Sequence, residues 1–356
     1  MQAAGAELIE HSTQHGSMFL ETVRQAWVHQ KRLRRLRLWL DTHPLAALIP
    51  VDSPAGNWSI CRTVRAMQPE TRIVHLVAPQ LWAWASWRIR RLRRLTDHVL
   101  CLLPFEQSWL ADRGVQATYV GHPAFDPPKG AHGKDDEHLP PGSPRLALLP
   151  GSRPGEITRN WPTMVEAFVQ LGRRHPQLHG VVAALDDSAE KLLRETAART
   201  LGTAWPDHLT LMTGRTEAVL DWCDAALVAS GTITLQLTAR LKPMVVMYSM
   251  RRTTAALAAC LVATRTYSLP NLVSEWAGLG RAVPELIPHF GKVEPVVREV
   301  DRILTDERAA QRQVEILTEV AARFCHRTFA EDAPRQLLAA VNGSLQGGTG
   351  SLSASA

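Results

Sequence analysis

The chain has 356 residues, of which 45% are hydrophobic and 21% are charged. At roughly 150 residues per domain, this length predicts about two domains. The composition is that of a globular protein and excludes a disordered, collagen-like or coiled-coil chain. No apolar run reaches the about 18 residues that a membrane-spanning helix needs, and a secretory signal is not expected at the first residues. The five cysteines lack any metal-binding spacing, so we expect free thiols and no metal site.

The net charge of +6 is unevenly distributed. Residues 31–37 and 88–94 hold ten of the 40 Lys and Arg and no acidic residue, which leaves the rest of the chain slightly acidic. Such patches attract phosphate groups, whether on nucleic acid, on anionic lipid or on a phosphorylated substrate.

The first third of the chain alternates between apolar strand patterns and helical patterns. Helices are predicted at residues 18–41, 58–67, 88–94 and 105–113. Strands are predicted at residues 45–51, 73–78, 98–103 and 115–120. This alternation is typical of a parallel sheet with helices on its faces.

A segment rich in Pro and Gly, residues 127–144, interrupts the pattern and is predicted to be an exposed linker. The alternation then restarts. Strands are predicted at residues 146–149, 179–184, 209–212, 225–229 and 243–248, with helices between them and at 253–264. The sequence therefore predicts an α/β protein of two Rossmann-like domains, 1–126 and 145–292, facing a cleft, followed by C-terminal helices at 293–341 and a disordered tail at 342–356.

Two Gly-containing turns follow predicted strands of the second domain. The first is LLPGSR at 148–153, where the backbone of Gly151 and Ser152 and the cation of Arg153 form a candidate anion site. The second is ASGTITL at 229–235, where Ser230, Gly231, Thr232 and Thr234 offer amides and hydroxyls to a phosphate, and Gln236 lies within reach of a ribose hydroxyl. The alternatives are an ordinary turn and a capped helix start. Together the two turns favour a diphosphate site.

Two polar residues of the first domain lie at predicted strand ends. Asp52 is a candidate general base, or a turn residue that caps the next helix. His122 is a candidate acid/base or substrate contact, and a structural role is the alternative.

Tryptophans adjoin the second basic run. Trp82, Trp84 and Trp87 precede or border Arg88 and Arg91. Aromatic side chains beside cations suit a membrane interface. The same residues also suit base stacking, or a core of Trp beneath solvated Arg.

These motifs together resemble the lipid-A-disaccharide synthases, which are GT-B glycosyltransferases. The resemblance rests on the following stretches: 1–9 (MQAAGAELI), 51–57 (VDSPAGN), 77–84 (VAPQLWAW), 103–106 (LPFE), 120–123 (VGHP), 148–153 (LLPGSR), 229–235 (ASGTITL), 242–246 (KPMVV), 268–272 (SLPNL) and 283–286 (VPEL).

The resemblance implies an inverting transfer of 2,3-diacylglucosamine from its UDP derivative to 2,3-diacylglucosamine 1-phosphate, without metal or cofactor. It implies that Asp52 is the base, that Arg153 and the Ser230 turn hold the leaving UDP, and that Asn271 lies in the active site with Glu285 as a further substrate contact. It also implies a cytoplasmic enzyme bound peripherally to the anionic inner membrane through the tryptophan–arginine region. A homodimer is left open.

The sequence departs from the family pattern at several points. An opening strand–GEASGD–helix–strand unit is not found, so the first domain is expected to be shortened. Gln236 stands where the family has a Glu, and Ala55 replaces an acid. The alternatives are therefore a non-catalytic homologue that binds a UDP-sugar, a different GT-B enzyme or UDP-sugar epimerase, and a basic nucleic-acid-binding protein.

Overall fold

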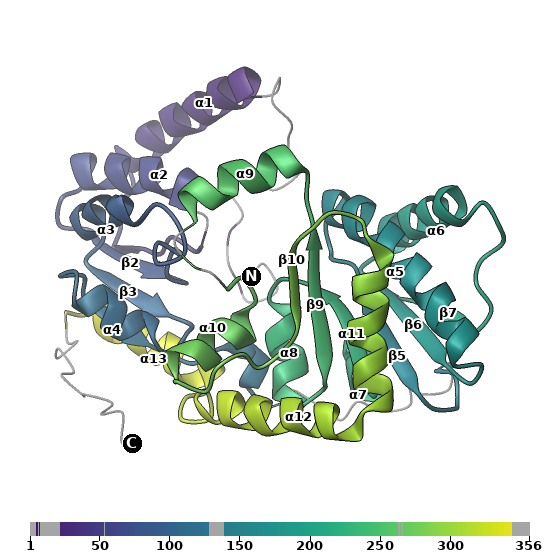
Figure 1. Cartoon of the computed structure of the whole chain (residues 1–356). Coiled ribbons are helices and arrows are strands. Elements are labelled where there is room, and N and C mark those ends of the chain that lie inside the picture. The colour runs from purple at the N-terminus through teal and green to yellow at the C-terminus, as the bar shows by residue number, and fades with distance from the viewer. Residues whose placement is uncertain are drawn as a thin grey trace.

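The computed structural model describes residues 22–52, 54–127, 139–262, 264 and 266–343, together with residues 5 and 7. Two α/β units lie side by side, and the last helix returns to the first unit (Figure 1). Most of the predicted linker and nearly all of the predicted disordered tail lie outside the described residues.

The N-terminal unit has a four-stranded parallel sheet in the order β1-β2-β3-β4. Its strands are β1 (Ala47–Leu48), β2 (Arg72–Leu76), β3 (His98–Cys101) and β4 (Ala117–Tyr119). Its helices are α1 (Thr22–Leu40), α2 (Pro54–Met67), η3 (Ser86–Arg88), α3 (Ile89–Leu95), α4 (Glu106–Ala111) and η4 (Pro123–Phe125). One face of the sheet, including Ile73 and Val99, is buried under these helices.

The C-terminal unit has a six-stranded parallel sheet in the order β10-β9-β8-β5-β6-β7. Its strands are β5 (Arg145–Leu149), β6 (His179–Ala184), β7 (Leu209–Thr213), β8 (Ala225–Ala229), β9 (Met244–Ser249) and β10 (Glu285–His289). Its helices are α5 (Pro154–Arg174), α6 (Asp187–Leu201), α7 (Thr216–Trp222), α8 (Ile233–Ala239), α9 (Arg252–Leu261), α10 (Leu269–Trp276) and α11 (Val293–Thr305). This is the doubly wound order, and the strand order reverses between β5 and β8.

Apolar residues alternate between the two faces of this sheet, as expected for strands covered on both sides. Leu146 and Leu148 of β5 pack with α5, α6 and α11, whereas Ala147 and Leu149 pack with α7 and α8. The carboxyl ends of β5 and β8 are thereby held next to each other at the point where a doubly wound sheet leaves a crevice.

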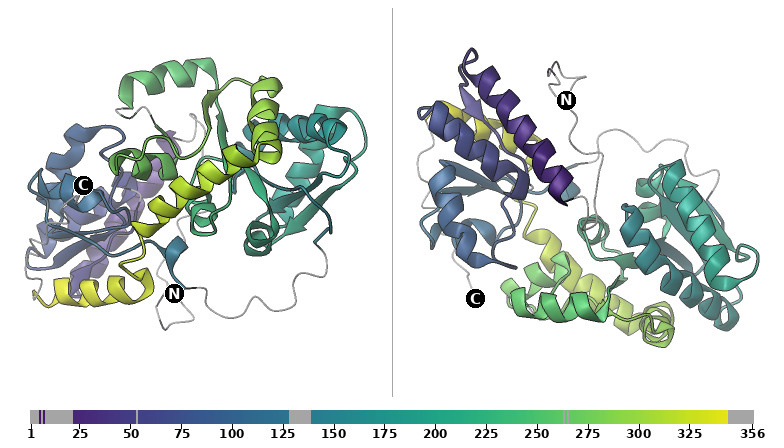
Figure 2. Two further views of the ribbon diagram at one scale, coloured as in Figure 1. Left: turned by 60° about the horizontal axis from the view of Figure 1, so that its bottom comes forward. Right: turned by 90° about the horizontal axis from the view of Figure 1, so that it is seen from above.

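The last two helices are α12 (Glu307–Ala322) and α13 (Phe329–Val341). Helix α12 runs along the bottom of the molecule in Figure 1, and α13 packs on β2 and β3 (Figure 2). There it covers the second face of the N-terminal sheet, where Val74, Leu100 and Val120 are fully buried. The Asp126 carboxylate accepts hydrogen bonds from the amides of Phe329, at 2.6 Å, and Ala330, at 2.9 Å. The predicted C-terminal helices therefore divide between the two units.

The predicted two α/β units with parallel sheets are confirmed, and the element bounds differ in places. Helix α5 begins at Pro154 and not at 161, because a proline fits the first turn and Glu156 completes a capping box. Of the predicted strand 45–51, only β1 and a bridge from Val51 to Leu76 pair. Strand β10 is not predicted, because it contains Pro288, which an edge strand tolerates.

Candidate active site

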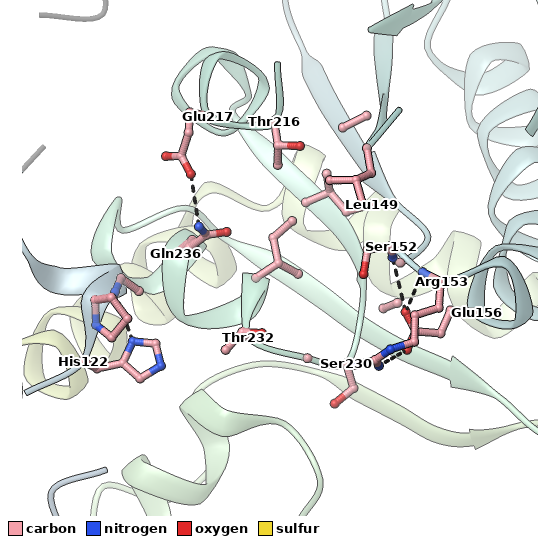
Figure 3. A pocket seen from close by; sticks show the side chains of 18 residues that line it. His122, Leu149, Ser152, Arg153, Glu156, Thr216, Glu217, Ser230, Thr232 and Gln236 are labelled. Atoms are coloured by element: carbon pink, nitrogen blue, oxygen red, sulfur yellow. Dashed lines mark hydrogen bonds and ion pairs between the residues drawn. The ribbon is translucent and has the colours of Figure 1, made fainter. Parts of the chain in front are cut away.

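A cleft of about 490 Å³ opens at the carboxyl ends of β5 and β8. Its walls come from the turn after β5, the turn after β8, the start of α7 and the segment that begins at His122 (Figure 3). The predicted residues Gly151, Ser152, Arg153, Ser230, Gly231, Thr232, Gln236 and His122 all line it. The cleft therefore lies at the crevice where doubly wound sheets bind their ligands.

The turn after β5 is stabilised by Glu156. One Glu156 oxygen accepts from the amides of Ser152, at 3.2 Å, and Arg153, at 3.4 Å, while the other accepts from the Arg153 guanidinium at 2.7 Å. Gly151 has φ +116°, which a residue with a β-carbon rarely adopts. The Arg153 side chain is 80% exposed. The turn thus presents a positioned but accessible cation to the cleft.

Hydrogen bonds on the side away from the cleft hold the turn after β8. The Ser230 hydroxyl donates to the Tyr267 carbonyl at 3.2 Å, and the buried Thr234 hydroxyl donates to the Gly231 carbonyl at 2.7 Å. A β-carbon at Gly231 would meet no atom within 4 Å, so this backbone faces open space. Thr234 stabilises the turn and does not line the cleft. Gly151 and Gly231 thus both line the cleft, and the Gly231 backbone is open to an anion, whereas Gly151 packs against Glu156.

A carboxylate that the sequence analysis missed lies beside Gln236. The Gln236 amide donates to Glu217 at 3.1 Å, and Glu217 also lines the cleft. The other Glu217 oxygen pairs with Arg240, which in turn pairs with Asp221 at 2.5 Å. The position of Glu217 at the start of α7, after β7, was the available signal, because every strand of a parallel sheet ends at this edge.

His122 is 5% exposed, and burial lowers its pKa to about 4. Its Nδ1 accepts from the Ala124 amide at 3.1 Å, so the neutral ring carries its proton on Nε2. Phe125 and Phe324 pack edge-on against the ring. His122 therefore presents a neutral N–H donor to the cleft from the N-terminal unit.

Asp52 lies at the carboxyl end of the N-terminal sheet, with φ +47°. Its amide donates to the Leu76 carbonyl at 3.0 Å, and its own carbonyl accepts from the Asn57 side chain at 2.7 Å. The residue is exposed and is not among those that line the cleft. These hydrogen bonds fix the Asp52 backbone on the first unit, outside the cleft.

Comparison with known proteins identifies the group to which these features belong. A family model described as lipid-A-disaccharide synthetase matches residues 1–337. The chain belongs to the lipid-A-disaccharide synthase family. It is accordingly a glycosyltransferase, and the fold predicted from the sequence motifs is confirmed.

Relatives within this family include the lipid-A-disaccharide synthase of Anaeromyxobacter dehalogenans strain 2CP-C, which is 38% identical over 289 residues, 79% of this chain and 72% of the relative. That of Acidobacterium capsulatum is 31% identical over 335 residues, 91% of this chain and 82% of the relative.

Similar solved structures share the fold at low identity. A putative UDP-N-acetylglucosamine 2-epimerase from Listeria monocytogenes is 15% identical with a TM-score of 0.63, covering 90% of this chain and 80% of that one. A co-structure of S. aureus MnaA with UDP is 14% identical with a TM-score of 0.60, covering 93% and 82%.

Two residues that the family resemblance places in the site lie behind it. Asn271 is fully buried; its amide donates to Val283 O and to Glu285, each at 3.0 Å, and its oxygen accepts from the amides of Ala282 and Val283. Glu285 accepts from the Tyr267 amide at 2.9 Å. The Ser230 hydroxyl donates to the Tyr267 carbonyl. Asn271 and Glu285 therefore support the turn after β8 through the backbone at Tyr267.

The tryptophan–arginine region divides into an inner and an outer part. The Trp82 indole donates to the Glu106 carboxylate at 3.0 Å, and burial raises the pKa of Glu106 to about 7. Trp84 and Trp87 are instead 45% and 66% exposed. The Arg88 guanidinium lies over the rings of Trp58, at 4.2 Å, and Trp84, at 4.9 Å.

Proposed function

We propose that this chain transfers 2,3-diacylglucosamine from its UDP derivative to 2,3-diacylglucosamine 1-phosphate, giving the β-1,6-linked disaccharide 1-phosphate and UDP. The observation that carries the proposal is the cleft at the reversal between β5 and β8, in a chain of this family. Arg153 and the open backbone at Gly231 line this cleft. These groups suit the two negative charges of a diphosphate.

In this reaction the Asp52 carboxylate removes the proton from the 6-hydroxyl of the acceptor. The oxygen then attacks C1 of the donor sugar from the face opposite UDP, and the C1–O bond to UDP breaks with its electron pair remaining on UDP. Arg153 and the backbone near Gly231 stabilise the charge that develops on this leaving group. The inversion at C1 follows from a single displacement.

The remaining cleft residues orient the donor. The Glu217 and Gln236 pair supplies an acceptor and a donor group for the ribose hydroxyls. The Nε2–H of His122 donates to the donor sugar or its phosphate, because a neutral ring keeps this proton at neutral pH. Glu217 thereby provides the carboxylate that position 236 lacks.

The proposal is tested by a transfer assay in detergent micelles with both acylated substrates. Arg153→Ala should lower the rate by about 100-fold, the usual effect of removing one charge-stabilising donor. Arg173→Ala, at the opposite end of α5, is the matched control and should retain wild-type activity. Release of UDP from UDP-N-acetylglucosamine, with no disaccharide from the acylated substrates, would contradict the proposal.

We also propose that the exposed part of the tryptophan–arginine region, Trp84, Trp87, Arg88 and Arg91, docks the enzyme on anionic membrane, where the acylated substrates lie. No helix of the described residues is long and apolar enough to span a bilayer. Sedimentation with phosphatidylglycerol vesicles should be lost in Trp87→Ala/Arg91→Ala and absent for phosphatidylcholine. Binding to duplex DNA, without binding to vesicles, would favour the nucleic-acid alternative. Light scattering measures the molar mass in solution and so tests for a homodimer.

A further inference from the structure

A second cavity, of about 430 Å³, lies along the outer side of α5 where β9 and β10 end. Three elements contribute to its wall: α5, the segment from β9 into α9, and the residues that follow β10. In Figure 1, α9 leaves the top of β9 and extends toward the N-terminal unit. None of the residues that line this cavity also lines the first cleft.

The charge of this cavity is strongly positive. Arg159, Arg251 and Arg252 line it, against one acidic side chain, Glu166. Within the described part of the chain, none of the three arginines forms an ion pair. Arg159 donates to the Tyr248 hydroxyl at 3.4 Å, and Arg252 lies 5.4 Å from the centre of the Phe290 ring. Three guanidiniums without carboxylate partners attract an anion.

Two buried polar side chains in the same wall have no partner among the described residues. They are Ser249, which is 8% exposed, and His289, which is 5% exposed. The Ser249 hydroxyl and the His289 Nε2 form no hydrogen bond there. A buried polar atom without a partner is unfavourable by about 1–3 kcal/mol, and a ligand with acceptor atoms would remove this penalty.

Apolar groups complete the wall, from Pro162, Met250 and Phe290. The volume exceeds what one phosphate ion fills, so the cavity also has room for an organic group attached to it. Arginine forks match phosphate oxygens in pairs. We infer that the cavity binds the phosphate of a phosphate monoester, with Arg159, Arg251 and Arg252 on its oxygens and the Ser249 hydroxyl as a further donor.

The cavity is linked to the turn of the first cleft by one buried side chain. The Asn160 amide donates to the Pro150 carbonyl at 3.0 Å, and its oxygen accepts from the Ser249 amide at 2.8 Å. Pro150 directly precedes Gly151. The two sites are therefore separate, and Asn160 contacts the backbone of both.

The inference is tested by calorimetric titration of the whole chain with glucose 1-phosphate and inorganic phosphate, and by sedimentation with vesicles containing phosphatidic acid. Arg251→Ala/Arg252→Ala should weaken binding at least about tenfold, since each charge-assisted contact is strong. Arg173→Ala is the matched control. Ser249→Ala should weaken binding several-fold without lowering the Tm, because it removes a hydroxyl that has no partner in the free protein.

Arg153→Ala separates this site from the first cleft. Binding that is lost in Arg153→Ala and kept in Arg251→Ala/Arg252→Ala would place the phosphate in the first cleft and overturn the inference, as would absence of binding by all three probes. Binding of soluble monoesters that is lost in Arg251→Ala/Arg252→Ala supports it. So does binding of phosphatidic acid vesicles that Trp87→Ala/Arg91→Ala retains and Arg251→Ala/Arg252→Ala loses, and the two results identify the source of the phosphate. None of these outcomes depends on the transfer reaction.

Discussion

Replacing Gly151 by Ala perturbs the turn that positions Arg153. With φ +116°, the residue lies where a β-carbon is strained. The new β-carbon would stand 2.6 Å from a Glu156 carboxylate oxygen and 2.7 Å from the Glu156 β-carbon. The carboxylate that fixes the turn must then move.

The magnitude follows from these two effects. A side chain held in a sparsely populated backbone region destabilises the fold by about 1–3 kcal/mol. If the turn keeps its shape, the Tm should fall by about 2–4 °C per kcal/mol. If the turn rearranges, the same energy appears as weaker UDP binding, by about 5- to 150-fold.

Gly155→Ala is the matched control, four residues further along the same segment. Gly155 is helical, and its new β-carbon would lie 3.4 Å from the far end of the long Arg159 side chain. Alanine is favoured over glycine in a helix, so this variant should keep or raise the wild-type Tm and keep the UDP affinity. Calorimetric titration with UDP and thermal unfolding measure both quantities. Equal values for the two variants would refute the reasoning.

Two further changes probe charge. Glu217→Gln should weaken UDP binding about tenfold in a calorimetric titration, because a ribose hydroxyl loses a charged acceptor. Asp221→Asn is the control: it removes only the ion pair of Arg240 with Asp221 and should leave UDP affinity unchanged. Equal losses of affinity in the two variants would reject the ribose contact. Burial lowers the pKa of His75 to about 4, so the unfolded chain binds the extra proton from about pH 6.5 downward and stability falls as pH falls toward 4. At pH 5 this lowers the free energy of unfolding by about 2 kcal/mol. Denaturant unfolding at pH 7.5 and pH 5 should therefore show a decrease in this free energy that is about 2 kcal/mol smaller for His75→Leu than for the wild type. Equal decreases in both proteins would reject the prediction.

The turns of the first cleft could be predicted from sequence because their chemistry is local. A strand, a glycine and a helix start follow one another within ten residues at both Gly151 and Gly231, and every parallel strand ends at the same sheet edge. The fold class followed from the same alternation.

Other features depended on register between distant elements. Glu217 belongs to a different strand–helix unit from Gln236, so only the assembled sheet brings them to 3.1 Å. Asn271 is polar and belongs to the SLPNL motif, yet its hydrogen bonds are all to buried groups behind the cleft. The second cavity joins α5 to residues 249–252 and 289–291, which no single stretch of sequence contains.

The contact between Asp126 and the start of α13 determines how the two units can move. The chain leaves the N-terminal unit just after Asp126 and returns to it just before Phe329. The two crossings are joined here by these hydrogen bonds and by the stacked rings of Phe125 and Phe324. Two crossings joined side by side act as a hinge, so we expect the units to rotate about this place rather than slide apart. His122 lies four residues from Asp126 and should hardly move relative to either unit during closure. Asp52, on the far edge of the N-terminal sheet, should travel furthest, so the proposed mechanism requires closure to bring this carboxylate to the donor sugar.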